Sequence, residues 1–565
     1  MKKNNSRRQF LQKSLLAATG VILAPNFISC KNDDDMFFDI DTTDFTNINF
    51  DHGVASFDPS SSSIIIWTRY SKSTSEIIWE IATDAQFKNK LRNGKVTTES
   101  TRDNTIAIEV TELDPNLKLY YRFLSETDEA ISAIGETITL PVNASEVRLA
   151  VCSCSNYQAG LFNVYDAMAN SNADIIIHLG DYIYEYGAGG YGATPENAFL
   201  NRNHEPSGEI LSLDDYRTRY KQYRSDMSLQ LAHQKKPFIC VWDDHEITND
   251  AYKDGAENHD EATEGSYEMR KQVALQAYSE FLPFSRLDAS DHSLIYRTFN
   301  IGNLVDLVML DTRIIGRDLQ LNIFDYFGTN GFDAVAYQTA ISDTSRSLLG
   351  ATQLNWLIGK IASNTAKWQV LGQQVLMGKM YVPAEMLTAF GSENFNQILL
   401  ELVTIKSRML AGDPTLTNAE KARVLTVLPY NLDAWDGYPV ERELFYKALN
   451  GKKIVTLAGD THNAWYNRLY TEGENSTEVG IEIATPGVSS PGFEAFIGKE
   501  PAVVGGFQQA LITLIDGLQY FDASRRGFLM ATFTPNDVKA EWTFLSTLLS
   551  ETYTTEVGNT ITYAT

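Results

Sequence analysis

Short runs of β-branched and aromatic residues mark the first part of the chain, from about residue 50 to residue 141. The runs lie at residues 63–69, 76–81, 105–110 and 119–124, and turn-forming clusters such as Asp58-Pro59-Ser60 separate them. Short strands at this spacing predict an antiparallel sandwich of the immunoglobulin or fibronectin type. The segment contains no cysteine pair, which disfavours a true antibody-type domain. We therefore expect an all-β domain over residues 46–142.

A different pattern begins at residue 146, where apolar runs alternate with helical stretches. The apolar runs lie at residues 147–152, 174–179, 237–242, 305–310, 368–377 and 453–457, and helical stretches lie at residues 216–223, 268–281 and 351–361. This alternation predicts an α/β or mixed layered domain. Residues 186–212 and 321–345 are rich in Gly, Asn and Ser and predict loops. Residues 521–533 and 540–549 fit either a closing strand and helix near a pocket or a packed tail.

Composition and charge exclude several classes of protein. The chain has 565 residues, of which 43% are hydrophobic, close to the soluble globular average, so it is not disordered, collagenous or a polytopic membrane protein. It carries 72 acidic and 47 basic residues, a formal net charge of -25. Such an acidic surface repels phosphate backbones, and we expect no nucleic acid as a stable partner. Four cysteines in so long a chain cannot form a disulfide framework.

The first 29 residues have the pattern of an export signal. Residues 6–10 carry a twin-arginine motif, and the apolar stretch at residues 15–24 is too short to span a bilayer of about 30 Å. The sequence Phe27-Ile28-Ser29-Cys30 resembles a lipobox, in which Cys30 would be lipidated; the alternative is a plain signal cut nearby. Residues 30–45 are acidic and predict a tether. We expect the twin-arginine export machinery as a partner, membrane attachment through Cys30, and a periplasmic or cell-surface location.

Residues of the types that can bind metals or ligands follow five of the apolar runs. We expect these side chains along one rim of a sheet, where mixed α/β proteins assemble their sites. The five segments are Ser153-Cys154-Ser155, Gly180-Asp181-Tyr182-Ile183-Tyr184-Glu185, Asp243-Asp244-His245-Glu246, Leu310-Asp311-Thr312-Arg313 and Gly459-Asp460-Thr461-His462.

Their spacing favours two cations. Asp181 follows a glycine turn and can bridge two metals, and Tyr184 lies on the same side if the segment turns helically. A phenolate ligand needs a strongly acidic metal such as ferric iron, because free tyrosine has a pKa of about 10. If the chain stays extended through Asp460 and His462, both side chains face one way and each can serve one metal.

Two further residues extend this interpretation. Cys154 can bind a metal as a thiolate, and His245, beside acidic residues, can orient or protonate a leaving group. Each motif alone has a simpler explanation, since Asp244-His245 could cap a helix and buried thiols usually only pack. The ordered occurrence of all the motifs at strand ends favours a metal site.

The same motifs resemble the PhoD-type alkaline phosphatase/phosphodiesterase family of the calcineurin-like metallophosphoesterase superfamily. The resemblance covers most of the mature chain and begins at residues 53–59 and 66–69, in the all-β domain. It implies an α/β (α+β layered) metallophosphoesterase sandwich, with central mixed β-sheets flanked by helices, over residues 145–550. The immunoglobulin/fibronectin-like domain precedes it. Motifs that carry the resemblance in this region include Gly180–Glu185, Asp243–Glu246, Gln373-Gln374-Val375, Trp435-Asp436-Gly437-Tyr438 and Gly459–His462.

The resemblance also implies a mixed centre of Fe(3+) and Ca(2+). By motif, the iron ligands would be Cys154, Asp181, Tyr184 and His462. Asp181 would bridge to calcium, which Asp460 and either Asp244 or Asn249 would complete. The superfamily usually has Asn-His where this chain has Asp244-His245, so that choice stays open. Arg313, Gln374 and Tyr438 are expected to line the substrate pocket.

The predicted function is hydrolysis of a phosphate ester by a hydroxide that two metals activate. Asp181 and His245 are the expected catalytic residues. The first alternative is a phosphodiesterase or phospholipase-D-like enzyme. The second is a non-catalytic surface-binding lipoprotein whose all-β domain does the work.

Overall fold

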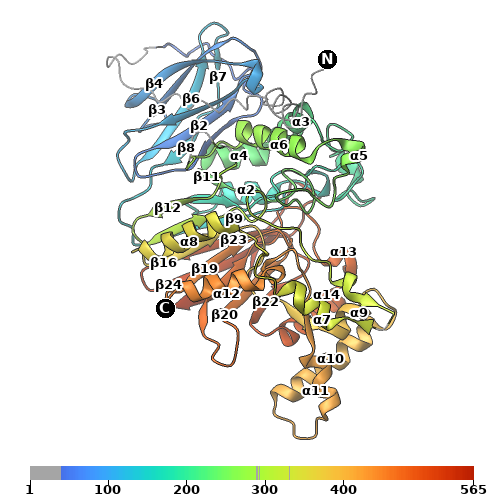
Figure 1. Cartoon of the computed structure of the whole chain (residues 1–565). Helices are drawn as coiled ribbons and strands as arrows, with labels where there is room; N and C mark the ends of the chain where they lie inside the picture. The colour runs from blue at the N-terminus through green and yellow to red at the C-terminus, as the bar shows by residue number, and fades with distance from the viewer. Residues whose placement is uncertain (1–39, 288–290, 292, 330, 565) are drawn as a thin grey trace, which may run out of the picture.

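The computed structural model describes residues 40–287, 291, 293–329 and 331–564 (Figure 1). The predicted signal peptide, Cys30 and most of the predicted tether therefore lie outside the described residues. Within those residues, no helix has the length and apolar character that crossing a membrane requires.

The N-terminal region is a two-layered β-sandwich, as the sequence predicts (Figure 1). Four of its strands coincide with the predicted runs, whereas short or polar strands were not predicted. One layer contains β1 (Val54–Phe57), β2 (Ile64–Arg69) and β5 (Thr105–Val110), and the other contains β4 (Lys90–Thr97), β3 (Glu76–Ala82), β6 (Lys118–Ser125), β7 (Ala130–Ile131) and β8 (Gly135–Ile138).

The first of these layers is continuous with the main sheet of the following region. The nine-stranded sheet has the order β25-β24-β23-β9-β10-β11-β1-β2-β5, and β1 pairs in parallel with β11 through Phe57 and Phe238. Strand β2 is buried on both faces, because Ile64 and Ile66 enter the sandwich core while Ile65 and Trp67 enter the main core. Strands covered on both faces are continuously apolar, which explains this run.

Two packed sheets form the centre of the molecule. The first continues through β9 (Val147–Cys152), β10 (Ile175–His178), β11 (Phe238–Cys240), β23 (Gly527–Phe533), β24 (Asp537–Leu545) and β25 (Thr555–Ala564). The second has the order β12-β13-β16-β19-β21-β20-β22, with β12 (Arg297–Ile301), β13 (Val305–Met309), β16 (Trp368–Gly372), β19 (Ile454–Ala458), β21 (Glu478–Ala484), β20 (Ala464–Tyr470) and β22 (Leu518–Asp522). One apolar core is shared by the two sheets and includes Leu149, Ile177, Met309 and Leu457.

Helices flank this pair of sheets (Figure 1). On the side of the N-terminal region lie α2 (Asn163–Ala169), α3 (Leu213–Arg224), α4 (Met227–Lys235), α5 (Glu261–Glu264) and α6 (Tyr267–Phe281). The remaining helices accompany the second sheet: α7 (Ala334–Ile341), α8 (Gly350–Ser363), α9 (Ala384–Ala389), α10 (Phe395–Leu410), α11 (Asn418–Leu425), α12 (Pro439–Ala448), α13 (Glu494–Ile497) and α14 (Pro501–Leu514). The layered arrangement agrees with the predicted fold class.

Two local predictions need correction. Residues 321–345 were expected to be a loop, but they contain the small hairpin of β14 (Phe327–Gly328) and β15 (Gly331–Phe332) followed by α7. Their aromatic and aliphatic side chains form a separate cluster that includes Ile323, Tyr337 and Ile341, which outweighs the local turn propensity. Residues 540–549 are not a helix, because β24 continues to Leu545 and pairs with β23 and β25. A separate two-stranded antiparallel sheet pairs β17 (Tyr381–Pro383) with β18 (Val427–Pro429), and α9, α10 and α11 lie between the two strands in the sequence.

Candidate metal centre

The segments with candidate ligands lie at the carboxyl ends of strands from both central sheets. Strands β9, β10 and β11 belong to the first sheet, whereas β13 and β19 belong to the second. A bridge between Ser153 and Gly487 and a hydrogen bond from Thr485 Oγ1 to the Val151 carbonyl (2.8 Å) join the two sheets at this end. The expectation of a single sheet rim is therefore wrong. The site forms where two sheet edges meet.

Four side chains that the sequence assigns to one metal lie together. Ligand atoms of Cys154, Asp181 and His462 are all within 4.8 Å of one another. The Tyr184 hydroxyl donates to Asp181 Oδ2 at 2.9 Å and lies 3.2 Å from His462 Nε2. Thiol, carboxylate, phenol and imidazole thus converge from β9, β10 and β19, which are far apart in the sequence.

The backbone turns sharply at these ligands. Cys154, Asp181, Asp460 and His462 have φ angles of 63°, 55°, 64° and 61°, in the left-handed region that few residues other than glycine adopt. Such strain concentrates at functional sites, where the surrounding structure enforces it. The condition that the chain stays extended through Asp460 and His462 is not met, because β19 ends at Ala458. The turn instead sends the two side chains into different clusters.

Two more acidic clusters adjoin the first. One contains Asp181, Asp244 and His245, and the other contains Asp243, Asp244 and Asp460; in each, the ligand atoms lie within 4.8 Å of one another. Asp181 and Asp244 each belong to two clusters and so link all three.

Asp244 and Asn249, the two alternatives for the calcium ligand, have different surroundings. The Asn249 amide group donates to Glu257 Oε2 at 2.9 Å, and the Asn249 backbone N–H donates to Glu185 Oε1 at 2.9 Å. The Asp244 carboxylate, in contrast, lies in two of the clusters. Asp243 is a further candidate ligand that the sequence analysis passed over, although it stands next to Asp244 in the same motif.

The site holds a surplus of buried negative charge. Burial, together with Asp244, Asp243 and Glu246, raises the pKa of Asp181 well above its usual value. Burial and Asp433 raise the pKa of Asp460 to about 7 despite the nearby guanidinium of Arg313. Buried carboxylates need a compensating charge, because desolvation otherwise makes them costly.

Two buried oxygens in this cluster lack any partner. Among the described residues, Asp181 Oδ1 and Asp243 Oδ2 accept no hydrogen bond. Burial also raises the pKa of Cys154 and of Tyr184 well above their usual values, so both stay protonated without added positive charge. A cation would satisfy the orphaned oxygens and stabilise the thiolate and phenolate, so the donor set fits metal ions.

His462 is oriented for coordination. Its Nδ1 lies 2.7 Å from the carbonyl of Pro491, to which it donates, which leaves Nε2 facing Tyr184 and Asp181. Burial lowers the pKa of His462 to about 3, so the ring is neutral. A backbone carbonyl that fixes the ring tautomer is a typical support for a metal-binding histidine.

The three residues expected to line the pocket are fully buried. Arg313 donates to Asp243, to Asp433 (2.8 Å) and to Asp460 (3.2 Å), so it balances charge within the cluster. Gln374 uses its amide for Thr312 Oγ1 and the Trp242 carbonyl, both at 2.6 Å. The Tyr438 hydroxyl donates to the Asp318 carbonyl. The polar atoms of Gln374 and Tyr438 are thus committed to holding strand ends and loops, and their placement does not support a pocket-lining role.

Three further residues of the site were given no role by the sequence analysis. Glu246 accepts from the backbone N–H groups of Asp181 (3.1 Å), Tyr182 (2.6 Å) and Asp243 (2.7 Å), so it fastens two ligand turns to each other. It belongs to a motif that the sequence analysis quoted. Ser490 donates to the Tyr184 hydroxyl at 2.7 Å, and Asp433 pairs with Arg313. Both come from segments that follow no predicted strand, so the strand-end argument could not find them.

Comparisons with known proteins agree with this architecture. The family model for PhoD-like phosphatase matches residues 149–542, and the model for the PhoD-like phosphatase N-terminal domain matches residues 38–141. Alkaline phosphatase D of Bacillus subtilis (strain 168) is 32% identical over 518 residues, which cover 88% of this chain and 78% of that protein.

Solved structures give the same result. A structure of PhoD superposes with a TM-score of 0.73 at 29% identity and covers 92% of this chain and 91% of its own. Purple acid phosphatase PPD1 from yellow lupin has a TM-score of 0.53 at 11% identity, covers 90% of this chain and 74% of its own, and shares the fold. The two-sheet fold, the convergent donor set and these matches together show that the chain belongs to the PhoD-like phosphatase family and is a phosphoesterase.

Proposed function

We propose that the protein is an exported, metal-dependent phosphatase whose catalytic centre is the group of clusters around Asp181. One observation carries this proposal: Asp181 shares one cluster with Cys154 and His462 and another with Asp244 and His245. A carboxylate placed between two donor sets is the residue type that bridges two cations.

The donor types suggest how two cations would be distributed. Cys154, Tyr184 and His462 offer sulfur, phenolate and imidazole donors, which suit a strongly acidic transition-metal ion such as ferric iron. Asp244 and Asp460 offer only oxygens, the donors that calcium prefers. Asp181 would contribute to both. Bound cations would lower the pKa of a coordinated water and neutralise the charge of the phosphoryl oxygens.

The side chains of the protein then have distinct tasks. Asp181 holds the two donor sets at a fixed separation, and Glu246 fastens the turn that carries Asp181 to the turn that carries Asp243. His245 lies beside Asp181 and Asp244 and would assist the departure of the leaving alkoxide. Arg313 balances the charge of Asp243 and Asp460, so the acidic residues can be packed together.

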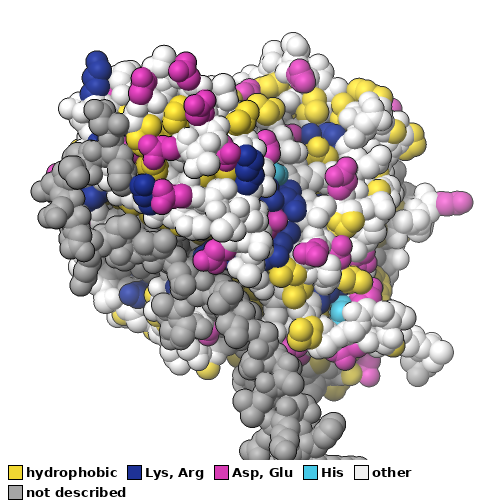
Figure 2. Space-filling view, turned by 90° about the horizontal axis from the view of Figure 1, so that it is seen from above, with side chains coloured by type: hydrophobic (Ala, Val, Ile, Leu, Met, Phe, Trp, Pro, Cys, Tyr) yellow, Lys and Arg dark blue, Asp and Glu magenta, His cyan; other side chains and the backbone are white. Residues whose placement is uncertain are grey.

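The surface agrees with a small ester as substrate. Acidic side chains are spread over the face shown in Figure 2, and basic side chains lie among them, some near its middle and others toward its edges. With a net charge of -25, long-range attraction of a polyanion is not expected. The charge thus disfavours a long polyanionic substrate and leaves a small ester. A phosphomonoester is the leading class because the family model and the relative are phosphatases, and a phosphodiester or phospholipid is the alternative.

Export is part of the proposal. Its support is the twin-arginine motif of residues 6–10, the short apolar stretch that follows, and Cys30 as a site of lipidation. Globomycin treatment and mass analysis of the mature N-terminus would test lipidation of Cys30.

Asp181→Asn tests the catalytic centre. We expect at least a 1000-fold loss of kcat, on the order of the largest effects of removing one catalytic group, together with loss of at least one equivalent of metal by elemental analysis. Asp174→Asn is the matched control, since Asp174 accepts from the Arg148 backbone at the opposite end of the same strand. Wild-type turnover in Asp181→Asn would refute the proposal.

A second experiment decides between the two substrate classes. It compares the rates of the wild-type enzyme on a monoester and a diester of the same alcohol.

A further inference from the structure

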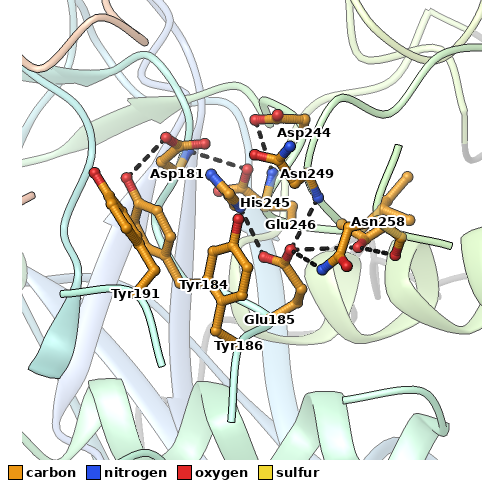
Figure 3. Close-up of polar contacts among 12 residues, drawn as sticks. Asp181, Tyr184, Glu185, Tyr186, Tyr191, Asp244, His245, Glu246, Asn249 and Asn258 are labelled. Carbon is orange, nitrogen blue, oxygen red and sulfur yellow. Dashed lines mark hydrogen bonds and ion pairs between the residues drawn. The ribbon is translucent and has the colours of Figure 1, made fainter. Parts of the chain in front are cut away.

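Glu185 is a completely buried carboxylate that the proposed chemistry does not use. Its Oε2 accepts a hydrogen bond from His245 Nδ1 at 2.7 Å. Its Oε1 accepts from the Asn249 backbone at 2.9 Å, from Asn258 Nδ2 at 3.0 Å and from Thr248 Oγ1 at 3.3 Å. Figure 3 shows Glu185 beneath the His245 ring, with dashed contacts to His245 on one side and to Asn249 and Asn258 on the other.

The contact with His245 determines which ring nitrogen faces the acidic cluster. Because Nδ1 donates to Glu185, Nε2 is the nitrogen left for a substrate or leaving group. The ring is also held from the side, since its centroid lies 4.2 Å from that of Tyr184 and 5.5 Å from that of Tyr186. Rotation of the ring would break the Glu185 contact and lose the packing against both tyrosines.

The other oxygen of Glu185 closes the segment that follows His245. Thr248 and Asn258 lie at the two ends of this segment, and Thr248 Oγ1 also donates to the Asn258 carbonyl at 2.8 Å. Asn258 is itself held by Glu209, which pairs with Arg270 at 2.6 Å. A single carboxylate therefore fixes both the His245 ring and the loop beside it.

We propose that Glu185 is a positioning residue, which holds the His245 ring in the orientation that turns Nε2 toward the leaving group. This inference rests on the proposed function, because it gives His245 a role in catalysis. A positioning role differs from that of a buried carboxylate that only stabilises the fold. A structural carboxylate would affect all substrates equally, whereas one that acts through His245 would matter most when the leaving group is strongly basic.

The test compares two monoesters on the full-length, metal-loaded enzyme. 4-Nitrophenyl phosphate has a weakly basic leaving group, which needs little assistance, and glycerol phosphate has a strongly basic one. Glu185→Gln should lower kcat for glycerol phosphate by about 10- to 100-fold, the range for residues that support a catalytic group, and change kcat for 4-nitrophenyl phosphate less than about 3-fold. Metal content should stay at the wild-type level.

Three further variants complete the design. His245→Gln should show the same dependence on the leaving group, and Glu185→Gln/His245→Gln should lose little more than His245→Gln, because the two residues act as a unit. Glu185→Asp keeps the charge but shortens the side chain, and we expect an intermediate selectivity between the esters. Glu441→Gln is the matched control. This buried carboxylate on α12 belongs to none of the three clusters and accepts from the Leu348 and Leu349 backbone at 3.0 and 2.9 Å, so its loss should leave both rates unchanged.

The outcomes separate the two proposals. Equal losses on both esters in His245→Gln would refute the role of His245 and, with it, that of Glu185. Leaving-group dependence in His245→Gln but not in the Glu185 variants would refute only the role of Glu185. If Glu185→Gln does not fold, Glu185→Asp decides, and equal rates on both esters in that variant would overturn the inference.

Discussion

Asp58 and Arg297, which are 239 positions apart, form a buried two-pronged ion pair where the N-terminal sandwich meets the central sheets. Arg297 Nε and one terminal nitrogen donate to the two carboxylate oxygens of Asp58, both at 2.7 Å. Asp58 Oδ2 also accepts from the Ser285 backbone at 2.6 Å. The sequence suggested only a turn at Asp58. The structure shows that this residue ties the first domain to β12 at the edge of the second sheet.

We therefore expect Asp58→Ala to be strongly destabilising. It leaves the Arg297 guanidinium buried without its carboxylate, which typically costs about 3–5 kcal/mol. Asp58→Ala/Arg297→Met should recover much of that loss, because no charge is then left uncompensated. Glu196→Ala is the control: its pair with Lys499 is two-thirds exposed on both sides, so we expect little change. Chemical denaturation followed by circular dichroism measures all three, and equal effects of Asp58→Ala and Glu196→Ala would contradict the prediction.

Gly180 immediately precedes Asp181 and should tolerate no side chain. Its φ is +107°, and a Cβ there would overlap the Cβ and backbone nitrogen of Asp243. Gly180→Ala should thus push apart the turns that carry Asp181 and Asp243, lowering both the melting temperature and the metal content. Gly189→Ala is the control for backbone strain alone, because Gly189 has a φ of +75° but open space where a Cβ would lie. Normal metal binding by Gly180→Ala would show that the two turns are not in close contact.

Removing metal should destabilise the protein as well as inactivate it. Without metal, the buried carboxyl groups of Asp181, Asp243 and Asp460 must either keep an uncompensated charge or take up protons, and both cost stability. Ligands that bind only the folded state stabilise it by RT ln(1 + [L]/Kd). We expect a chelator to lower the melting temperature by several degrees, and calcium with iron to restore it. The same treatment of Asp181→Asn should produce a clearly smaller shift. A melting temperature that the chelator leaves unchanged would argue against a metal-filled centre.

His204 should make the protein less stable in acid. Burial, together with Arg219, lowers its pKa to about 2, while the unfolded chain has a value near the usual 6.5. Below pH 6.5 the unfolded chain thus binds a proton that the folded protein does not, so this contribution to stability is present above pH 6.5 and lost as the pH falls. His204→Gln should reduce the loss of stability between pH 7 and pH 5 by about 2 kcal/mol.

Tyr223→Phe is the control for this pH effect. It removes the hydroxyl that lies 3.0 Å from His204 Nε2 but keeps the imidazole. Its cost in stability should therefore be nearly the same at both pH values. Urea denaturation at a series of pH values measures the difference, and parallel profiles for wild-type protein and His204→Gln would contradict the prediction.

The sequence by itself determined the layered fold class and the residues that gather at the strand ends. Apolar runs such as residues 147–152 and 174–179 are buried strands, and local order alone places Cys154 and Asp181 just beyond them. Hydrophobic periodicity and turn residues are local properties, so a chain can be interpreted this far without coordinates.

Only the tertiary structure decided which of these residues meet. The site joins the edges of two sheets, and left-handed turns at Asp460 and His462 direct neighbouring side chains into different clusters. The continuity of the N-terminal layer with β11 and the burial of Gln374 and Tyr438 were equally invisible in the sequence. These features depend on packing between segments hundreds of residues apart, and no local pattern encodes such contacts.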